Sequence, residues 1–320
     1  MSAEPRRARV RALAKINLSL KVLGKRPDAY HELRTIFQTI SLADTIGIEF
    51  TPGRQTAIEL ASNVDIPNNL VVRAARLALD GMKLRGRVSF LLEKRIPAGG
   101  GLGGGSSDAA AILLALPVLA GVNVPLGELT ALAAELGSDV PFFLLGGTAL
   151  GLGRGTELYP LPEAGELTGL LVAPEVPIAT AEAYQALNRK LTSGLQSPIM
   201  NSFQALSWLL DRGLSPEEWS AFGENDFEAF AFQRYPRLAA IRRKLRKAGA
   251  RPVMLSGSGS ALFGIFSRRE DRERWRRQFP EHQTEAFRFV TRVRYRRMWW
   301  RSLRDHIEGE TWPLRSRYAR

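Results

Sequence analysis

The chain has 320 residues, a length that favours two domains, each large enough to bury its own core. Its composition, 45% hydrophobic and 24% charged, is ordinary for a soluble globular protein, and the absence of cysteine excludes disulfides and thiolate catalysis. The net charge of +13 suits an anionic ligand, from a nucleotide to a nucleic acid, but identifies none of them.

Two features bear on where the protein works. The basic N-terminus is followed by an apolar stretch that Lys15 and Asn17 interrupt, which argues against a secretory signal. The longest apolar run, residues 109–122, contains a proline and is too short to span a bilayer. We therefore expect a cytoplasmic protein.

The first half of the chain mixes strand and helix patterns. Apolar runs and alternation predict strands over residues 9–25, 33–50, 56–61 and 87–97, and helical spacing predicts helices over 69–82, 106–122 and 125–137. Asn69 is the expected N-cap of the first helix, and hydroxyl or carboxylate side chains at 106–108 are the expected caps of the second. No regular βαβ rhythm appears, which indicates an α+β fold.

A glycine-rich stretch, residues 144–158, is the expected edge of the first domain. We predict an N-terminal domain over residues 1–155, a C-terminal domain over 156–290 and a basic extension over 291–320. In the second half the patterns predict strands over 169–173 and 284–293, a glycine turn between apolar runs over 251–266, and helices over 180–188, 201–211, 225–232, 237–249 and 268–279.

Six glycines occupy seven positions, 99–105, between a predicted strand and a predicted helix. Glycine loses the most conformational freedom on folding, so this density costs stability unless a bare backbone is needed. Gly99, Gly101 and Gly104 satisfy G-x-G-x-x-G, but the acidic residue expected about twenty positions later at a second strand is missing. A P-loop is excluded because Ser106 follows Gly105 directly, with no lysine before it.

A third interpretation is a loop that wraps a polyphosphate with backbone N–H groups and passes the anion to the start of the next helix. Ser106 and Ser107 add hydroxyl groups, one of which could bind magnesium. A flexible linker is the alternative, and it is disfavoured because a strongly apolar helix follows at once.

The same loop carries a family resemblance. PAGGGLGGGSSDAA, residues 97–110, resembles the second motif of the GHMP kinases. Three further stretches resemble one member of that family: AKINLSLKVLGKRPDAYHEL from residue 14, GSDVPFFLLGGTALGLGRGTEL from residue 137 and VMLSGSGSALFGIF from residue 253. The likeness runs from about Arg11 to about Phe289 and stops before the last thirty residues.

The resemblance implies a two-domain α+β fold with an ATP-binding N-terminal domain, a smaller C-terminal domain and the active site between them. It implies ATP-dependent phosphorylation of the 2-hydroxyl of 4-diphosphocytidyl-2-C-methyl-D-erythritol, in the non-mevalonate route to isoprenoid precursors. Mg2+ would arrive with ATP, because no acidic cluster in the sequence identifies a metal site. Another small-molecule kinase of the family remains open, as does a nucleic-acid-binding protein that uses the fold without catalysis.

For catalysis the resemblance implies Asp139 as the base that accepts the hydroxyl proton and Lys15 as the partner that orients it. From the residues alone, Asp139 ahead of Pro141 is also a good helix N-cap. Lys15, inside an apolar strand, is either paired or faces outward. Asn17 shares its strand face and could hold the substrate hydroxyl.

For the cytidine group of the substrate the resemblance implies Tyr30 and His31, with Tyr184 as the second stacking ring and Thr180 nearby. Ordinary packing is the alternative for Tyr184. Ala29 stands where the family usually has glycine, and it costs roughly 1 kcal/mol if the position needs a positive φ.

The implied ATP site has three parts. Asn69 and Lys94 would line its adenine side. The phosphate loop would comprise Pro97, Ala98, Gly99, Gly100, Gly101, Leu102, Gly103, Gly104, Gly105, Ser106 and Ser107. A further glycine motif, Gly257, Ser258 and Gly259, could close on the phosphates or on the substrate diphosphate, or could simply join two strands.

The final stretch is strongly basic. From Arg288 onward ten arginines face three acidic residues, interleaved with tyrosine and tryptophan. We favour an amphipathic helix that packs on its own protein or on a second subunit, so a monomer and a homodimer both remain open. Contact with nucleic acid or an anionic membrane surface is the less favoured alternative.

Overall fold

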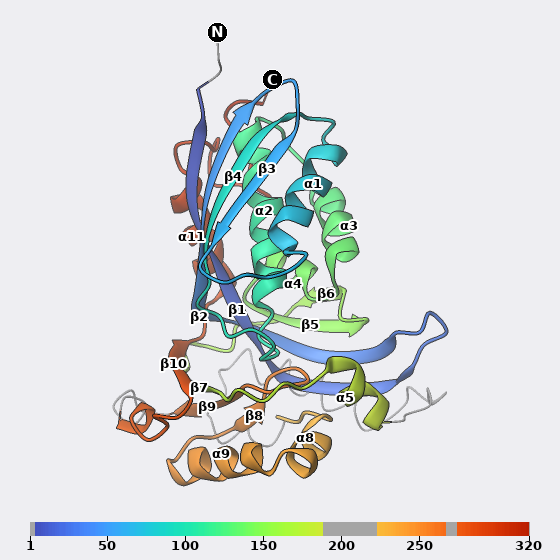
Figure 1. The fold of residues 1–320 in the computed structure, drawn as a ribbon, viewed down its shortest axis with the longest axis vertical. Coiled ribbons are helices and arrows are strands. Elements are labelled where there is room, and N and C mark those ends of the chain that lie inside the picture. Colours follow the sequence, from blue (N-terminus) through green and yellow to red (C-terminus); the bar gives the residue numbers. More distant parts are fainter. Residues whose placement is uncertain (1–3, 188–222, 267–273, 320) are drawn as a thin grey trace.

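The computed structural model describes residues 4–187, 223–266 and 274–319. Two sheets organise them into an upper and a lower part in Figure 1. The upper sheet has the strand order β3-β4-β2-β5-β6, with β1 paired to β2, and the lower sheet has the order β10-β7-β9-β8. The α+β class predicted from the sequence is confirmed.

Two long strands, β1 (Arg6–Lys25) and β2 (His31–Pro52), form an antiparallel hairpin that runs from the upper into the lower part (Figure 1). β1 alternates between buried and accessible positions at its start, but residues 12–20 are all buried, because that stretch is covered on both faces. The other strands of the sheet are β3 (Ala57–Ser62), β4 (Gly86–Glu93), β5 (Thr148–Gly153) and β6 (Glu157–Pro160).

Four helices cover one face of the upper sheet (Figure 1): α1 (Leu70–Gly81), α2 (Gly104–Ala120), α3 (Leu126–Leu136) and α4 (Val140–Leu145). The predicted cap of α1 is confirmed, because the Asn69 side chain accepts a hydrogen bond from the Val71 N–H. The predicted caps of α2 at residues 106–108 are wrong. That helix begins at Gly104, after a left-handed Gly103, and the Ser107 hydroxyl instead donates to the Leu13 carbonyl.

The hairpin of β1 and β2 joins the two parts of the molecule. The Leu20 N–H donates to the Glu224 carbonyl over 2.7 Å, and the Asp226 N–H donates back to the Leu20 carbonyl over 3.0 Å. The turn at the end of the hairpin therefore lies beside the lower part, near α5 (Thr180–Leu187) in Figure 1. This crossing brings residues of the first thirty positions to the second half of the chain.

The lower sheet packs against helices on its outer side (Figure 1). Its strands and helices are β7 (Thr168–Ala173), β8 (Val253–Leu255), β9 (Leu262–Phe266), β10 (Gln283–Arg288), α8 (Glu228–Arg234) and α9 (Pro236–Lys247). The predicted helix over 201–211 and the first half of the one over 268–279 lie outside the described residues. The strand predicted to continue to 293 ends at Arg288, and a helix capped by Thr291 begins at Arg292.

That last helix, α11 (Arg292–Leu303), returns to the upper part. Tyr295, Trp299 and Leu303 are buried in the upper core, and the Tyr295 hydroxyl donates to the Phe143 carbonyl over 2.5 Å. The extension thus packs on its own protein, which was the favoured interpretation of its sequence. Within the described part of the chain, no helix has both the length and the apolar character needed to cross a bilayer. The cytoplasmic location stays a prediction.

Candidate active site

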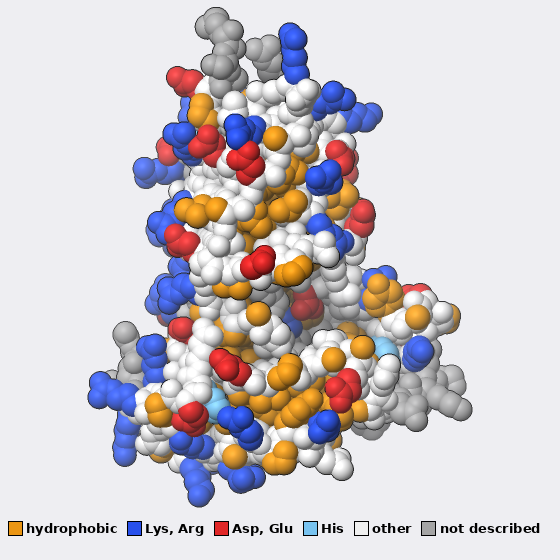
Figure 2. Space-filling model, viewed as in Figure 1, with side chains coloured by type: hydrophobic (Ala, Val, Ile, Leu, Met, Phe, Trp, Pro, Cys, Tyr) orange, Lys and Arg blue, Asp and Glu red, His pale blue; other side chains and the backbone are white. Residues whose placement is uncertain are grey.

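A cavity of about 830 Å³ opens between the upper and lower parts, and Figure 2 shows a hollow there. Strand β1, the hairpin turn, the glycine loop, the start of α4 and helix α5 all contribute to its wall. The predicted site residues that line it are Lys15, Asn17, Tyr30, His31, Gly101, Gly103, Ser106, Asp139, Thr180, Tyr184, Gly257 and Ser258. Residues from both halves of the chain therefore meet at one place.

Lys15 and Asp139 form an ion pair in this cavity, with 3.3 Å between Nζ and Oδ2. The Lys15 side chain is only 4% exposed, whereas the Asp139 side chain is 35% exposed and reaches the open space. Asp139 occupies the N-cap position of α4, but its carboxylate makes no capping hydrogen bond there. The buried Lys15 ammonium group therefore orients the accessible Asp139 carboxylate. This arrangement is suited to accepting a proton from a ligand in the cavity.

Asn17 connects this pair to the second glycine motif. Its Oδ1 accepts hydrogen bonds from the Lys15 ammonium (2.7 Å) and from the Gly257 N–H (3.0 Å). Its Nδ2 donates to the Thr35 hydroxyl over 2.7 Å. Most of the hydrogen-bonding capacity of Asn17 is thus spent on Lys15, Gly257 and Thr35, and its role toward a substrate stays a prediction.

The two glycine motifs touch each other, which explains why the loop needs a bare backbone. A Cβ at Gly101, whose φ is +74°, would lie 2.0 Å from the Ser256 carbonyl oxygen. A Cβ at Gly103, with φ +70°, would lie 2.9 Å from the Phe143 ring and 3.2 Å from the Lys15 side chain. The left-handed turns and these close approaches both require glycine. Gly99, Gly101 and Gly103 have positive φ and alternate with other residues, the backbone pattern found in anion-binding nests.

The two serines after the loop differ in their surroundings. Ser107 is buried and its hydroxyl donates to the Leu13 carbonyl over 2.7 Å, so it fixes α2 against β1. Ser106 lines the cavity. Of these two hydroxyls, the one at Ser106 is placed to meet a ligand. In the described part of the chain, no three histidine, aspartate or glutamate side chains converge as a metal site.

Aromatic side chains gather at the hairpin turn. The His31 and Tyr184 rings stack with 4.3 Å between centroids and 19° between planes, so no base fits between them. The Tyr30 ring is half exposed, and the Arg154 guanidinium lies over it at 3.4 Å. Thr180 and Ser258 hydroxyls lie 3.1 Å apart, which joins α5 to the second glycine motif.

At the hairpin turn, the surroundings keep the His31 ring neutral, and two basic side chains line the cavity. Burial, with a smaller contribution from Lys25, lowers the pKa of His31, so its ring is neutral at pH 7 and can both donate and accept a hydrogen bond. Burial, together with the Asp139 charge, raises the pKa of Tyr184, which stays a phenol. Lys25 and Arg154 both line the cavity and supply positive charge for an anionic substrate.

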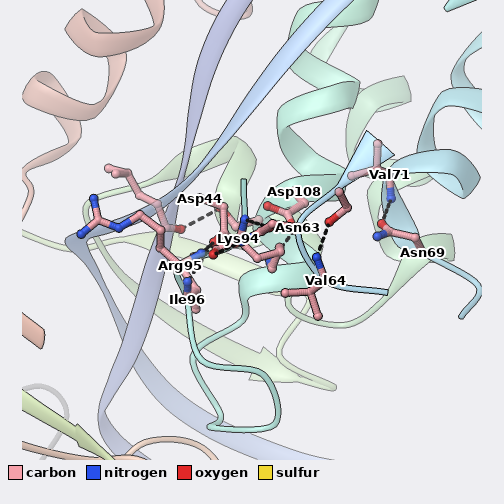
Figure 3. Close-up of polar contacts among 12 residues, drawn as sticks. Asp44, Asn63, Val64, Asn69, Val71, Lys94, Arg95, Ile96 and Asp108 are labelled. Carbon is pink, nitrogen blue, oxygen red and sulfur yellow. Dashed lines mark hydrogen bonds and ion pairs between the residues drawn. The ribbon is translucent and has the colours of Figure 1, made fainter. Parts of the chain in front are cut away.

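The two residues predicted at the adenine lie apart from the cavity lining. Asn69 caps α1. Lys94 is buried with its ammonium between the carboxylates of Asp44 and Asp108, as Figure 3 shows, although its Nζ would also lie 3.3 Å from a Cβ at Gly104. Its role as an adenine contact stays a prediction.

Comparison with known proteins agrees with this geometry. Residues 69–147 match the profile of the GHMP kinases N terminal domain, and residues 208–284 match that of the GHMP kinases C terminal. A 4-diphosphocytidyl-2-C-methyl-D-erythritol kinase of Solibacter usitatus is 54% identical over 317 residues, 98% of each chain. The chain belongs to the 4-diphosphocytidyl-2-C-methyl-D-erythritol kinase family of GHMP kinases.

Solved structures agree with membership of this kinase family. The crystal structure of a 4-(cytidine 5'-diphospho)-2C-methyl-D-erythritol kinase superposes with a TM-score of 0.74 at 38% identity, covering 88% of this chain and 98% of the other. A homoserine kinase from Cytophaga hutchinsonii, at 16% identity, has a TM-score of 0.68 and covers 89% of this chain and 95% of its own. The second match shows the shared fold alone.

The basic extension is also found within the family, which corrects the sequence interpretation. We expected the likeness to stop before the last thirty residues, but the match to the Solibacter usitatus kinase covers 98% of the chain. The match to the kinase of Gloeobacter violaceus, at 39% identity, covers 80% of this chain and 85% of its own. The extension is therefore shared with at least one member of the family, and in this chain its helix packs into the upper core.

Sequence reasoning missed several residues of the site. Arg154, Lys25 and Gln185 line the cavity, and Arg154 lies within the glycine-rich stretch 144–158, for which we named no site residue from the sequence, although the family resemblance implied Asp139 nearby. Asn225 was also missed. Its buried amide donates to the Leu255 and Gly257 carbonyls and so holds the second glycine motif in place. The available signal was an asparagine at the first position of the helix predicted over 225–232, a residue type that favours helix caps.

Proposed function

We propose that this chain transfers the γ-phosphoryl group of ATP to the 2-hydroxyl of 4-diphosphocytidyl-2-C-methyl-D-erythritol, a step in the non-mevalonate route to isoprenoid precursors. The observation that carries the proposal is the Lys15–Asp139 ion pair, which lies in the same cavity as the glycine loop and the aromatic residues of the hairpin turn. Membership of the kinase family supports the same reaction.

In this mechanism Asp139 accepts the proton of the 2-hydroxyl as the oxygen bonds to the γ-phosphorus. The bond from that phosphorus to the β–γ bridging oxygen breaks, and ADP leaves. The Lys15 ammonium holds the Asp139 carboxylate in place and stabilises negative charge near the transferred group. Asn17 keeps Lys15 in position and presents its remaining amide N–H to the substrate.

The glycine loop and the start of α2 bind the triphosphate through backbone N–H groups, and the second glycine motif closes on the phosphates from the opposite side. The contact between Gly101 and Ser256 supports this, because it places both motifs at one end of the cavity. Ser106 is our candidate protein ligand for Mg2+, which, when bound with ATP, neutralises charge on the phosphates.

The cytidine end lies at the hairpin turn in this proposal. The exposed Tyr30 ring and the stacked pair of His31 and Tyr184 offer aromatic faces to a base, and the neutral His31 ring can bond to its edge. Lys25 and Arg154 face the diphosphate. A small substrate such as homoserine or mevalonate would leave this end of the cavity empty.

A coupled assay that records ADP release tests the proposal, with 4-diphosphocytidyl-2-C-methyl-D-erythritol, homoserine and mevalonate offered in parallel. We expect turnover with the cytidyl substrate alone. No turnover with it, or faster turnover with either smaller alcohol, contradicts the proposal. A nucleic-acid-binding function without catalysis would show as ATP-independent binding that weakens steeply with salt.

A further inference from the structure

A buried cluster of charged side chains lies at the two ends of the glycine loop, outside the cavity lining (Figure 3). The Lys94 ammonium contacts the carboxylates of Asp44 and Asp108, and all three side chains are less than a tenth exposed. Asp44 comes from β2, Lys94 follows β4 and Asp108 belongs to α2. One ammonium group therefore joins three elements that are distant in sequence.

The entrance of the loop is fixed by this cluster. Asp44 Oδ1 accepts hydrogen bonds from the Arg95 and Ile96 N–H groups at 2.5 and 2.8 Å. On the other side of the strand end, the Asn63 amide bonds twice to the Lys94 backbone, accepting from its N–H (2.8 Å) and donating to its carbonyl (3.2 Å). The loop that starts at residue 97 therefore leaves from a backbone held by two side chains.

The exit of the loop is fixed by the same ammonium group. Asp108 lies four residues after Gly104, the first residue of α2, and its Oδ2 is 2.7 Å from Lys94 Nζ. A Cβ at Gly104 would lie 3.0 Å from the Ile96 side chain and 3.3 Å from Lys94 Nζ. The first turn of α2 is thus packed directly on the residues that precede the loop.

The cluster is costly as a purely stabilising element. Two carboxylates share one ammonium group, and Asp108 Oδ1 is buried without a hydrogen-bond partner among the described residues. Burial raises the pKa of Asp108 to about 7, the Asp44 charge adds to this, and the Lys94 charge opposes it. Buried ion pairs are weak sources of stability, so a positional role accounts better for this arrangement.

We propose that Asp44, Lys94 and Asp108 form a clamp that holds both ends of the loop, residues 97–103, at the separation that ATP binding requires. The inference rests on the proposed function in one respect, since it takes the loop to be the triphosphate site. A loop that is held at both ends loses less conformational entropy when its N–H groups converge on an anion, and so binds it more tightly. In this proposal the three act as positioning residues, through their contacts at the two ends of the loop, since none of them lines the described cavity.

Asp108→Asn tests the clamp at pH 8, where the parent carboxylate is largely ionised. The amide keeps the shape of the side chain and removes the charge that draws α2 to Lys94. We expect the Kd of ATP with Mg2+, measured by titration calorimetry, to rise about tenfold. Amide hydrogen exchange of residues 98–105 without nucleotide should become faster, while that of α3 stays unchanged. Asp80→Asn, the same substitution on the exposed end of α1, is the matched control.

Asn63→Ala is a second variant that removes only exposed hydrogen bonds and therefore folds. We expect a smaller rise in the ATP Kd, about threefold, with faster exchange at the loop entrance. In steady-state kinetics, both variants should have a higher KM for ATP and a kcat within twofold of the parent. If the cluster only stabilised the fold, the variants would instead have a smaller active fraction and an unchanged KM for ATP. An unchanged Kd in both variants overturns the clamp, and so does a weaker Kd with unchanged loop exchange.

Binding of ATP and loop exchange involve no second substrate. If the parent binds ATP but does not phosphorylate 4-diphosphocytidyl-2-C-methyl-D-erythritol, the proposed substrate is wrong and the clamp can still be tested. If the parent phosphorylates that substrate and the variants bind ATP as it does, the clamp is wrong and the function stands. The two proposals therefore fail separately.

Discussion

From the sequence, Asp139 could be a helix N-cap or a catalytic base, and its side-chain contacts favour the catalytic base. Its position ahead of Pro141 is typical of a helix N-cap, and it does occupy that position in α4. The side chain nevertheless pairs with Lys15 over 3.3 Å and makes no capping bond. The sequence around Asp139 correctly predicts its place at the start of α4. Its ion-pair partner, Lys15, is 124 residues away in the sequence, so that contact follows only from the fold.

Asp139→Asn is expected to lower kcat by about 10³-fold, because the amide cannot accept the hydroxyl proton and general base catalysis contributes 10²–10⁴. The amide keeps the size of the side chain, so the Kd values of ATP and of the second substrate should stay within a few-fold of the parent. Single-turnover kinetics and titration calorimetry measure the two effects separately.

Asp65→Asn, on an exposed loop, is the matched control and should have parent activity. A parent-like kcat in Asp139→Asn would show that the carboxylate is not the base and that the proton leaves by another route.

Lys94 shows what residue-level reasoning leaves out. The family resemblance implied that Lys94, in the strand predicted over 87–97, lines the adenine side of the ATP site. The carboxylates that surround it belong to residues 50 positions before and 14 positions after it, and no periodicity links them. Charge pairing across a fold cannot be read from spacing, because it depends on which strand neighbours which.

At the scale of elements, the hairpin turn carries backbone strain at Ala29. Its φ is +67°, so the position does have the positive φ that was the condition for a cost at Ala29, where the family usually has glycine. The Arg26 N–H donates to the Tyr30 carbonyl across the turn, and the Tyr30 N–H donates to Asp28, so the turn is fixed by its hydrogen bonds and Ala29 must adopt its shape.

Ala29→Gly is therefore expected to raise the free energy of unfolding by up to about 1 kcal/mol, because relief of the left-handed strain exceeds the added entropy of the unfolded chain. Urea denaturation measures it. Ala57→Gly, at an exposed position of β3 with no positive φ, is the control and should lower the free energy of unfolding by roughly 0.5–1 kcal/mol. A destabilised Ala29→Gly would show that the turn relaxes in solution.

The start of a helix could be predicted where a capping residue marks it, and less well where the helix begins inside the glycine loop. The cap of α1 at Asn69 follows from local chemistry and is confirmed. The start of α2 was predicted two residues late, because Gly103 and Gly104 are poor helix residues by propensity. Both positions are closely packed: a Cβ at Gly103, the N-cap, would lie 2.9 Å from the Phe143 ring, and a Cβ at Gly104 would lie 3.0 Å from the Ile96 side chain.

At the scale of the whole molecule, the sequence indicated two domains and an α+β class, but not how the parts join. The β1–β2 hairpin enters the lower part at Leu20, and α11 returns from the lower part to the upper core. Both connections are long-range, and neither has a local signature, because a strand pattern does not state which sheet its far end meets. The first connection places residues of β1 and of the hairpin turn in the wall of the cavity between the two parts.

The return of α11 to the upper core leads us to expect that a substitution in this helix lowers stability without affecting the cavity. Trp299 is 1% exposed and packs in the upper core beside Tyr295, with the two rings 6.3 Å apart. Trp299→Ala is expected to lower the free energy of unfolding by about 3–5 kcal/mol, because it removes a large buried ring and leaves a void. Urea denaturation measures the loss, and the ATP Kd of the folded variant should be unchanged, since α11 does not line the cavity.

Arg297 lies on the exposed side of the same helix, so Arg297→Ala is the matched control. It should change the free energy of unfolding by no more than about 0.5 kcal/mol. The pair of variants separates the two interpretations of the extension. If its aromatic residues served mainly to hold nucleic acid or a membrane, Trp299→Ala would weaken that binding and leave the unfolding curve in place. A loss of stability confined to Trp299→Ala instead means that α11 serves as part of the upper core.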